Sequence, residues 1–321
     1  MTSRRGLNQM PVNLKDLRNR IKSVKSTQQI TKAMKLVSAA KFGRAQHNVV
    51  NARPYALSLA QLTAKLAGLV SGGSAHPLMN DVSSKVAIVL VISSERGLCG
   101  GYNSNVSKQA IKTIDELELE GFKVTAVCIG KKAFQTLNRR RKLVLKKKDE
   151  PIFVTENEYA ADANVLVPGE GLVSITTPFD KPTNAMATRL SEAFAKLYTD
   201  EKIGKFVIVY NKFQSAMSQI PTADIVLPLH VGSASIEAEP IFEPEIDELL
   251  EHVIPRYMTS RLFQTLLESV ASEQGARMTA MDNATRNAKE MERKLQITYQ
   301  RARQAAITNE LIEIISGAEA L

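Results

Sequence analysis

The chain has 321 residues, of which 44% are hydrophobic, so it can bury one large core or two modest cores. Its longest apolar run, Val86 to Ile92, is far shorter than the roughly 18 residues that a membrane-spanning helix needs, and its first ten residues lack the apolar stretch of a secretory signal. The two cysteines, Cys99 and Cys128, form no CxxC pair, which excludes a disulfide framework and favours small buried side chains in a reducing compartment.

The net charge of +9 is concentrated near the N-terminus. Between Leu14 and Arg53 there are ten lysines and arginines but one acid, Asp16, so the excess in this segment equals the whole net charge. From Pro255 to the end, nine bases nearly balance eight acids. A basic stripe of this kind suits an acidic protein surface, a nucleic acid or an anionic lipid, and charge alone leaves all three open.

The segment from residue 14 to residue 69 is predicted to be one long helix, bent at Pro54, because its apolar residues recur at helical spacing. The first apolar residues step by three and four, which predicts a coiled-coil seam. They are Leu14, Leu17, Ile21 and Val24. After the polar stretch Ser26 to Gln29, the spacing resumes in a shifted phase at Ile30, Met34, Val37 and Lys41. We therefore expect the heptad to slip after Val24 and the supercoil to become irregular there.

The central part of the chain, residues 85–230, alternates between strand and helix patterns. Strands are predicted at Lys85–Ser93, Lys123–Ile129 and Lys205–Tyr210, and helices at Val106–Leu119 and Thr183–Tyr198. This order predicts a Rossmann-like α/β domain with a mainly parallel sheet. The stretch Val70 to Ser84 contains Ser-Gly-Gly-Ser, which is typical of a linker.

The last 77 residues, 245–321, are predicted to be a second long helix, about 110 Å from end to end. Spacings of three and four define a second seam. Its positions are Met281, Ala284, Ala288, Met291, Leu295, Thr298, Ala302 and Ala305. A helix of this length needs a partner along its seam, and the N-terminal helix is the tethered candidate. The predicted fold class is therefore α/β, with an antiparallel two-helix coiled coil formed by both termini and a central α/β domain.

Three further patterns are weak candidates for functional sites. The glycine-rich loop Ser93–Asn103 follows a strand and opens a helix, but its spacing is neither GxGxxG nor a P-loop, which favours a tight packing turn over a nucleotide site. The basic runs Arg139–Lys142 and Lys146–Lys148 flank a predicted short strand, Leu143–Leu145, and are typical of a solvated sheet edge. The four histidines lack metal-ligand spacing, so neither a metal nor a catalytic group is expected.

The run Ile307–Ala320 closely resembles the C-terminal signature of the gamma subunit of F-type ATP synthases. The resemblance extends to Ser272–Gln274, Arg277–Met281 and Arg303–Ala306 on the same helix. Near the N-terminus, the matching segments are Ile30–Val37 and Ala39–Lys41, and in the centre Arg96–Gly101. The three separated motifs occur in the family's order, and the resemblance extends over nearly the whole chain.

This resemblance implies a non-catalytic rotor shaft that needs no cofactor. In the family, the paired helices enter a ring of three alpha and three beta subunits, while the α/β domain sits on the membrane-embedded c ring beside an epsilon-type subunit. The positions that match ring-contacting residues are Met34, Arg96, Arg303, Gln304, Thr308, Glu310 and Glu313. The implied location is peripheral, on the cytoplasmic side of a bacterial plasma membrane or, alternatively, on the matrix side of the mitochondrial inner membrane.

Two other functions remain as alternatives at this stage. The basic first helix and the arginine-lysine runs also suit a coiled-coil protein that binds nucleic acid, although the resemblance implies no such partner. The glycine-rich loop leaves a nucleotide-dependent α/β enzyme as a second alternative. Salt-sensitive binding to DNA or RNA would support the first, and a nucleotide-induced shift in melting temperature would support the second.

Overall fold

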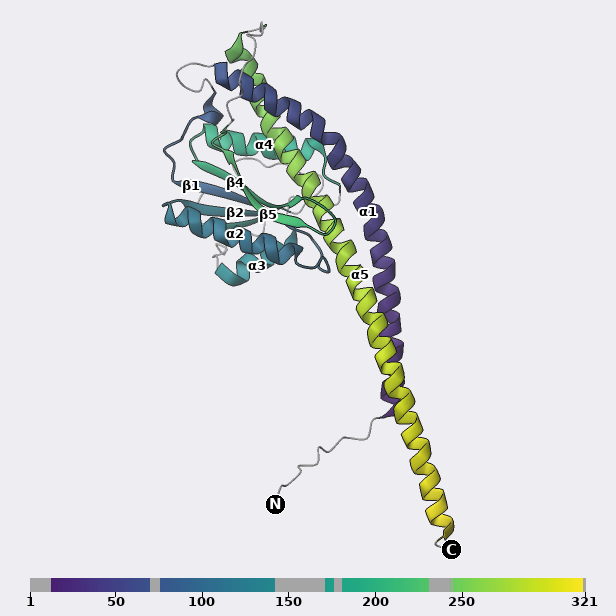
Figure 1. Ribbon diagram of the computed structural model, residues 1–321. Coiled ribbons are helices and arrows are strands. Elements are labelled where there is room, and N and C mark those ends of the chain that lie inside the picture. The colour runs from purple at the N-terminus through teal and green to yellow at the C-terminus, as the bar shows by residue number, and fades with distance from the viewer. Residues whose placement is uncertain are drawn as a thin grey trace, which may run out of the picture. The chain divides into compact units, whose positions relative to one another are not determined.

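The computed structural model describes residues 13–69, 76–141, 171–175, 181–230, 243 and 245–319. The chain divides into two compact units, one made of residues 1–37 and 280–321 and the other of residues 38–279. Helices α1 (Leu14–Leu69) and α5 (Ile246–Glu319) both contribute residues to each unit (Figure 1). Apart from Asn13, the described part of the first unit consists of these two helices.

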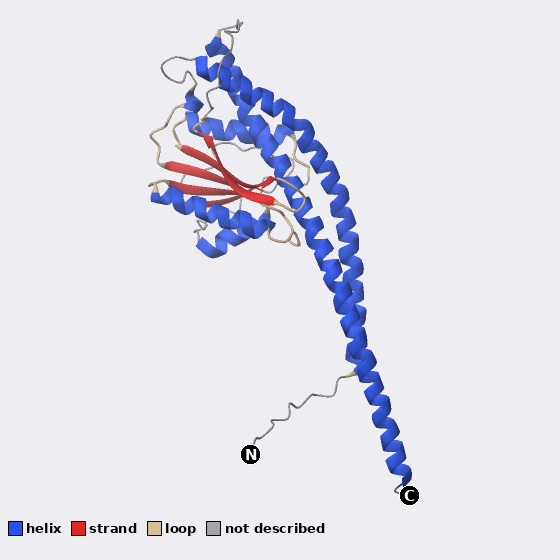
Figure 2. Cartoon of the chain, viewed as in Figure 1, coloured by secondary structure: helices blue, strands red, loops and turns tan. Residues whose placement is uncertain are grey.

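The unit of residues 38–279 is built around a five-stranded sheet. Its strands are β1 (Val86–Ile92), β2 (Lys123–Ile129), β3 (Gly171–Ile175), β4 (Lys205–Phe213) and β5 (Gln219–Leu227). They lie in the order β3-β2-β1-β4-β5, and every neighbouring pair is parallel except β4 and β5, which are antiparallel (Figure 2). This is the strand order of one Rossmann half followed by strands 4 and 5, so the expected mainly parallel α/β fold is confirmed.

Both faces of this sheet are covered, as parallel strands require. Helices α2 (Tyr102–Leu119) and α3 (Lys131–Arg141) pack on one face, against the short side chains of β1 and β2 (Figure 1). Helix α4 (Asn184–Thr199) and residues of α1 and α5 cover the other face, where Phe194 stacks on Phe206 with ring centroids 4.2 Å apart. The short helix η1 (Pro77–Met79) buries Leu78 in the same core.

Two strands and two helices were absent from the sequence prediction; one of the helices, η1, lies within the stretch that was predicted to be a linker. Strand β5 lies at the edge of the sheet, where a proline such as Pro221 is tolerated and where several side chains are exposed. Its hydrophobic pattern is therefore weak. Strand β3 has five residues and little signal of its own. Helix α3 ends in the basic run, so Arg139 and Arg140 lie on a helix rather than beside a strand, while the predicted strand Leu143–Leu145 lies outside the described residues.

Candidate coupling surfaces

Three polar contacts join α1 and α5 in the unit of residues 1–37 and 280–321. The Arg18 guanidinium donates a hydrogen bond to the Tyr299 hydroxyl at 2.8 Å. The Thr285 hydroxyl donates to that of Thr31 at 2.9 Å. The Lys35 ammonium lies 2.6 Å from an Asp282 carboxylate oxygen. The two residue numbers in each pair add up to 316 or 317, so the helices are antiparallel and keep one register throughout.

On α1, the seam that faces α5 continues without interruption. The buried and half-buried positions step by three and four from the first turn of the helix. They are Leu14, Leu17, Ile21, Val24, Gln28, Thr31 and Lys35. The predicted slip after Val24 is therefore wrong. Polar side chains occupy the seam because two of them have partners on α5, whereas the apolar residues used to infer the slip, Ile30 and Val37, are 57% and 58% exposed.

On α5, five of the eight predicted seam residues are shielded from solvent. Met281, Ala284, Ala288, Leu295 and Ala302 are buried or half-buried, as a seam requires. Met291 is 55% exposed, and Thr298 and Ala305 are also exposed, so assigning these three to the seam is wrong. The residues that follow them, Glu292, Tyr299 and Ala306, are half-buried instead. The amphipathic ring of Tyr299 fits this position because its face meets the Arg18 guanidinium, 5.8 Å from the centroid, and its hydroxyl accepts a hydrogen bond.

Most of the expected ring-contact residues lie at the C-terminal end of α5. Arg303, Gln304, Thr308, Glu310 and Glu313 are all exposed. The Thr308 hydroxyl donates to the carbonyl oxygen of Gln304, one turn earlier, at 2.9 Å, so these two residues share one stretch of the helix surface.

The pair register explains this exposure. Leu14, at which α1 begins, lies opposite Ala302 or Arg303, so no described residue of α1 faces the remaining turns of α5. From Gln304 to Glu319 these turns span about 24 Å. Met34 is half-buried and lies opposite Asp282 or Asn283, about 30 Å along the rod from Arg303, so these two predicted contacts are separate.

Arg96 belongs to the other unit, in the loop between β1 and α2. The loop is held by Asn103, whose side-chain oxygen accepts from the Ser94 amide at 3.1 Å and whose amide group donates to the Cys99 sulfur at 3.1 Å. Leu98 has a φ of 66°, in the left-handed region that non-glycine residues rarely adopt, and is 63% exposed. The loop therefore presents Arg96 and Leu98 outward.

A buried ion pair on α5 supports this loop, and it was not predicted from the sequence. Arg277 lies 2.7 Å from a Glu273 carboxylate oxygen, and the two side chains are 12% and 4% exposed. The same guanidinium donates to the carbonyl oxygen of Gly97 at 3.4 Å. An acid followed four residues later by a base, within a run of small and apolar residues, is the signal that could have identified the pair.

Hydrogen bonds join the turns of α5 around this pair to strand β4 and to helix α2. The Ser272 hydroxyl donates to the carbonyl oxygen of Asn211 at 2.9 Å, and the Tyr102 hydroxyl donates to that of Ser269 at 3.2 Å. A Cβ on Gly275 would lie 3.2 Å from the Cα of Ala216, so a glycine allows this close approach. The expectation that the glycine-rich loop is a packing turn fits these contacts.

Burial disfavours the ionised form of two side chains at this loop, Cys99 and Tyr102. Desolvation raises the pKa of the Cys99 thiol and raises that of the Tyr102 hydroxyl well above its usual value. The described residues contain no group of three side chains that could hold a metal ion. None of the described helices has an apolar stretch long enough to cross a lipid bilayer.

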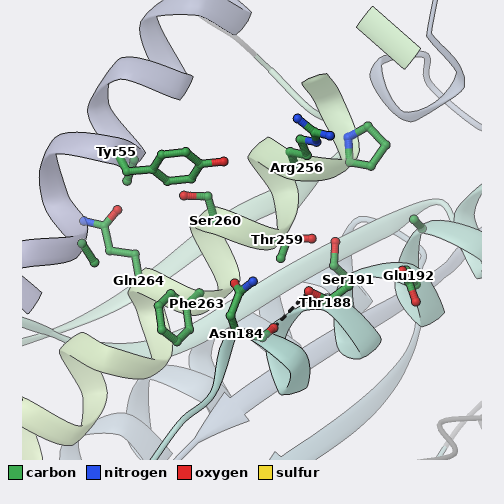
Figure 3. A pocket seen from close by; sticks show the side chains of 14 residues that line it. Tyr55, Asn184, Thr188, Ser191, Glu192, Arg256, Thr259, Ser260, Phe263 and Gln264 are labelled. Atoms are coloured by element: carbon green, nitrogen blue, oxygen red, sulfur yellow. Dashed lines mark hydrogen bonds between the residues drawn. The ribbon is translucent and has the colours of Figure 1, made fainter. Parts of the chain in front are cut away.

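A cavity of about 770 Å³ opens between α1, α4 and α5 in the unit of residues 38–279 (Figure 3). Tyr55 and Phe263 supply aromatic surface, while Glu192 and Arg256 bring charges of opposite sign. The cavity is lined by Ala52, Tyr55, Ala56, Asn184, Thr188, Ser191, Glu192, Ala195, Pro255, Arg256, Thr259, Ser260, Phe263 and Gln264. None of the predicted contact residues is among them, and the mixed wall points to no single ligand class.

Comparison with known proteins places this architecture in a family. The family model described as ATP synthase matches residues 13–321. The ATP synthase gamma chain of Geobacter metallireducens is 42% identical over 311 residues, which cover 96% of this chain and 98% of the relative. That of Mesorhizobium japonicum is 40% identical over 316 residues, covering 96% and 99%.

Solved structures share the fold. A chain of the Euglena gracilis mitochondrial ATP synthase, in an assembly described as OSCP/F1/c-ring in rotational state 3, superposes with a TM-score of 0.64 at 20% identity, covering 96% of this chain and 94% of that one. A chain of the central stalk and c ring of the Tetrahymena thermophila enzyme gives a TM-score of 0.51 at 23% identity, covering 79% and 99%. From the family model and the curated relatives, the chain belongs to the ATP synthase family, among the gamma chains.

Proposed function

We propose that this chain is the non-catalytic rotor shaft of an ATP synthase, which carries torque between a c ring and a catalytic ring of three alpha and three beta subunits. The observation that carries the proposal is the antiparallel pair of α1 and α5, whose register is fixed by polar contacts at three heights. A shaft must turn as one piece, and helices that cannot slide past each other meet this requirement.

The exposed residues at the end of α5 are suited to contacts that form and break. Arg303 can make bidentate hydrogen bonds to carboxylates, and Gln304 and Thr308 offer uncharged donors and acceptors. Such exposed polar groups bind a partner without a large desolvation cost, so each contact can be released in the next step. We assign Glu310, Glu313, Met34 and Arg96 to the same ring contacts, the last at a different part of the molecule.

We assign a separate role to each of two proposed domains. Residues 14–69 and 245–321 form one discontinuous coiled-coil domain, and residues 85–230 form the domain that contacts the c ring and an epsilon-type subunit. The proposed location is the surface of an energy-coupling membrane, on the cytoplasmic side of a bacterial plasma membrane. The bacterial sources of the curated relatives support this choice over a mitochondrial one.

Coupling in the assembled enzyme tests the proposal. In membranes that carry Gln304→Ala or Thr308→Ala, we expect proton pumping per ATP hydrolysed to fall about two- to tenfold, because each change removes hydrogen bonds of about 1 kcal/mol. Gln300→Ala is the matched control, since Gln300 is exposed one turn earlier on α5. A loss of helix content in the isolated variants, or an equal effect of the control, would show that these residues serve packing rather than coupling.

Co-purification tests the partners. A tag on this chain should recover alpha and beta subunits in a ratio of three of each to one gamma chain. A stable assembly that hydrolyses ATP and pumps protons without this chain would contradict the shaft assignment.

A further inference from the structure

A second, smaller cavity of about 380 Å³ lies wholly within the unit of residues 38–279. Its walls come from α1, from Lys181 and Pro182, which precede α4, and from α5. They are Lys41, Arg44, Ala45, Asn48, Lys181, Pro182, Leu267, Val270 and Gln274. At about 30 Å³ per water molecule, this volume holds roughly a dozen waters, which is room for a small hydrated anion but not for a large ligand.

The charged residues that line this cavity are all basic. Lys41 and Arg44 stand on α1, Lys181 stands before α4, and the nine lining residues include no acid. In the part of the chain that the structure describes, neither Arg44 nor Lys181 forms an ion pair. Helix α4 begins at Asn184, three residues after Lys181, so the partial positive charge of a helix N-terminus adds to the same side.

Gln274 supplies a fixed polar group in the wall. Gln274 is only 2% exposed, and it lines the cavity. Within the described residues, its side-chain amide forms no hydrogen bond, and its polar atoms are not among the buried atoms that lack a partner, so they reach the space of the cavity. A polar group in the wall of such a cavity is usually satisfied by water or by a ligand.

The neighbours of Gln274 on α5 are committed to other contacts. Glu273 pairs with Arg277, and Ser272 donates to the carbonyl oxygen of Asn211. Gly275 packs against Ala216. Gln274 thus stands out in this turn as a polar side chain that is directed toward the cavity and left for a ligand.

We propose that this cavity binds a tetrahedral oxyanion, a phosphate group, between Arg44, Lys181 and the Gln274 amide. The planar guanidinium of Arg44 can donate two parallel hydrogen bonds to phosphate oxygens, and the Lys181 ammonium acts as a point charge. The Gln274 side-chain NH₂ donates from the buried wall, and Asn48 adds a second amide at the rim. The phosphate group comes from inorganic phosphate or from the terminal phosphate of a nucleotide.

Titration of the purified full-length chain tests this proposal and does not depend on the shaft assignment. Inorganic phosphate is added in a chloride buffer while binding is followed by calorimetry and by the width of the phosphorus NMR signal. We expect saturable binding with a dissociation constant of about a millimolar, because the cations are exposed and bind weakly. A parallel titration with ADP, with adenosine as its control, distinguishes a free phosphate from a nucleotide.

Two variants locate the site. Gln274→Leu should weaken phosphate binding about tenfold, and Arg44→Gln about fivefold, whereas Arg256→Gln should leave it unchanged. Arg256 is the matched control because it is an exposed arginine on α5 at the other cavity (Figure 3). Should Gln274→Leu lose helix content, Arg44→Gln still decides the question, since that residue is exposed.

The proposal is overturned by non-saturable binding of both phosphate and ADP. It is also overturned if Arg256→Gln weakens binding as much as Arg44→Gln, because the effect would then reflect net charge alone. Saturable binding of either phosphate or ADP that is weakened about fivefold in the Arg44 variant and unchanged in the Arg256 variant supports it.

Discussion

The buried ion pair between Glu273 and Arg277 should contribute strongly to stability. Glu273→Gln would leave the Arg277 charge buried without its carboxylate, and removing one member of such a pair typically costs about 3 to 5 kcal/mol. In a unit of residues 38–279, each kcal/mol lowers the melting temperature by about 2 to 4 °C, so a loss of about 3 kcal/mol should lower it by about 6 to 12 °C. Urea unfolding followed by circular dichroism measures the loss.

A double-mutant cycle separates the pair from its surroundings. Arg277→Gln should also destabilise the chain, and the double variant should lose less than the sum of the two single losses, because neither charge is then left unpaired. Glu290→Gln is the control, since Glu290 forms an exposed pair of the same spacing with Lys294, and it should have no measurable effect.

The pair also has a local effect that can be measured. Because Arg277 donates to the carbonyl oxygen of Gly97, its loss should free the loop and speed tryptic cleavage after Arg96. If both single variants keep the parental stability and the parental cleavage rate, the pair behaves as a surface pair and the reasoning from its burial is refuted.

Three further predictions concern other parts of the chain. Gly43→Ala should stabilise the protein by about 0.5 to 1 kcal/mol, because its Cβ meets nothing within 4 Å, whereas Gly275→Ala should destabilise it by up to about 2 kcal/mol through contact with a neighbouring backbone; urea titration compares the two. Lys35 lowers the pKa of Asp282, so this carboxylate stabilises the fold above its ordinary pKa near 4, and the contribution disappears as the pH falls through the lowered value. When the pH is lowered from about 5 to about 3, the melting temperature of Lys35→Met should therefore fall by less than that of the parent protein. Equal decreases in the two proteins would contradict this. The buried Cys99 should react with a thiol reagent far more slowly in the native chain than in urea, since burial raises its pKa, and equal rates would contradict this.

Periodicity predicted the architecture well where hydrophobic burial decides it. The strand Lys123–Ile129 was predicted with the bounds that it has, because a strand covered on both faces is a continuous β-branched run. Edge strand β5 escaped detection because one side of it is exposed and its pattern is diluted by polar residues.

The seam of the rod shows where such reasoning fails. Ile30 and Val37 indicated a shifted phase, but the seam follows Thr31 and Lys35, whose partners lie some 250 residues away in sequence. A pattern within one helix cannot show that a polar side chain will be satisfied by another helix. For the same reason, the sequence did not predict the proposed binding role of Gln274, because the cavity that it lines is formed by three segments far apart in the chain.

The residues that pair across α1 and α5 also restrict how far one helix can shift along the other. If α5 slid along α1 by one heptad, about 10.5 Å, Lys35 would face Lys289 instead of an acid, and Thr31 would face Glu292. Like charges would then repel, and an alanine-rich seam would offer little apolar gain in return. Axial slip is therefore penalised, and twist applied to one helix is passed to the other at the same height.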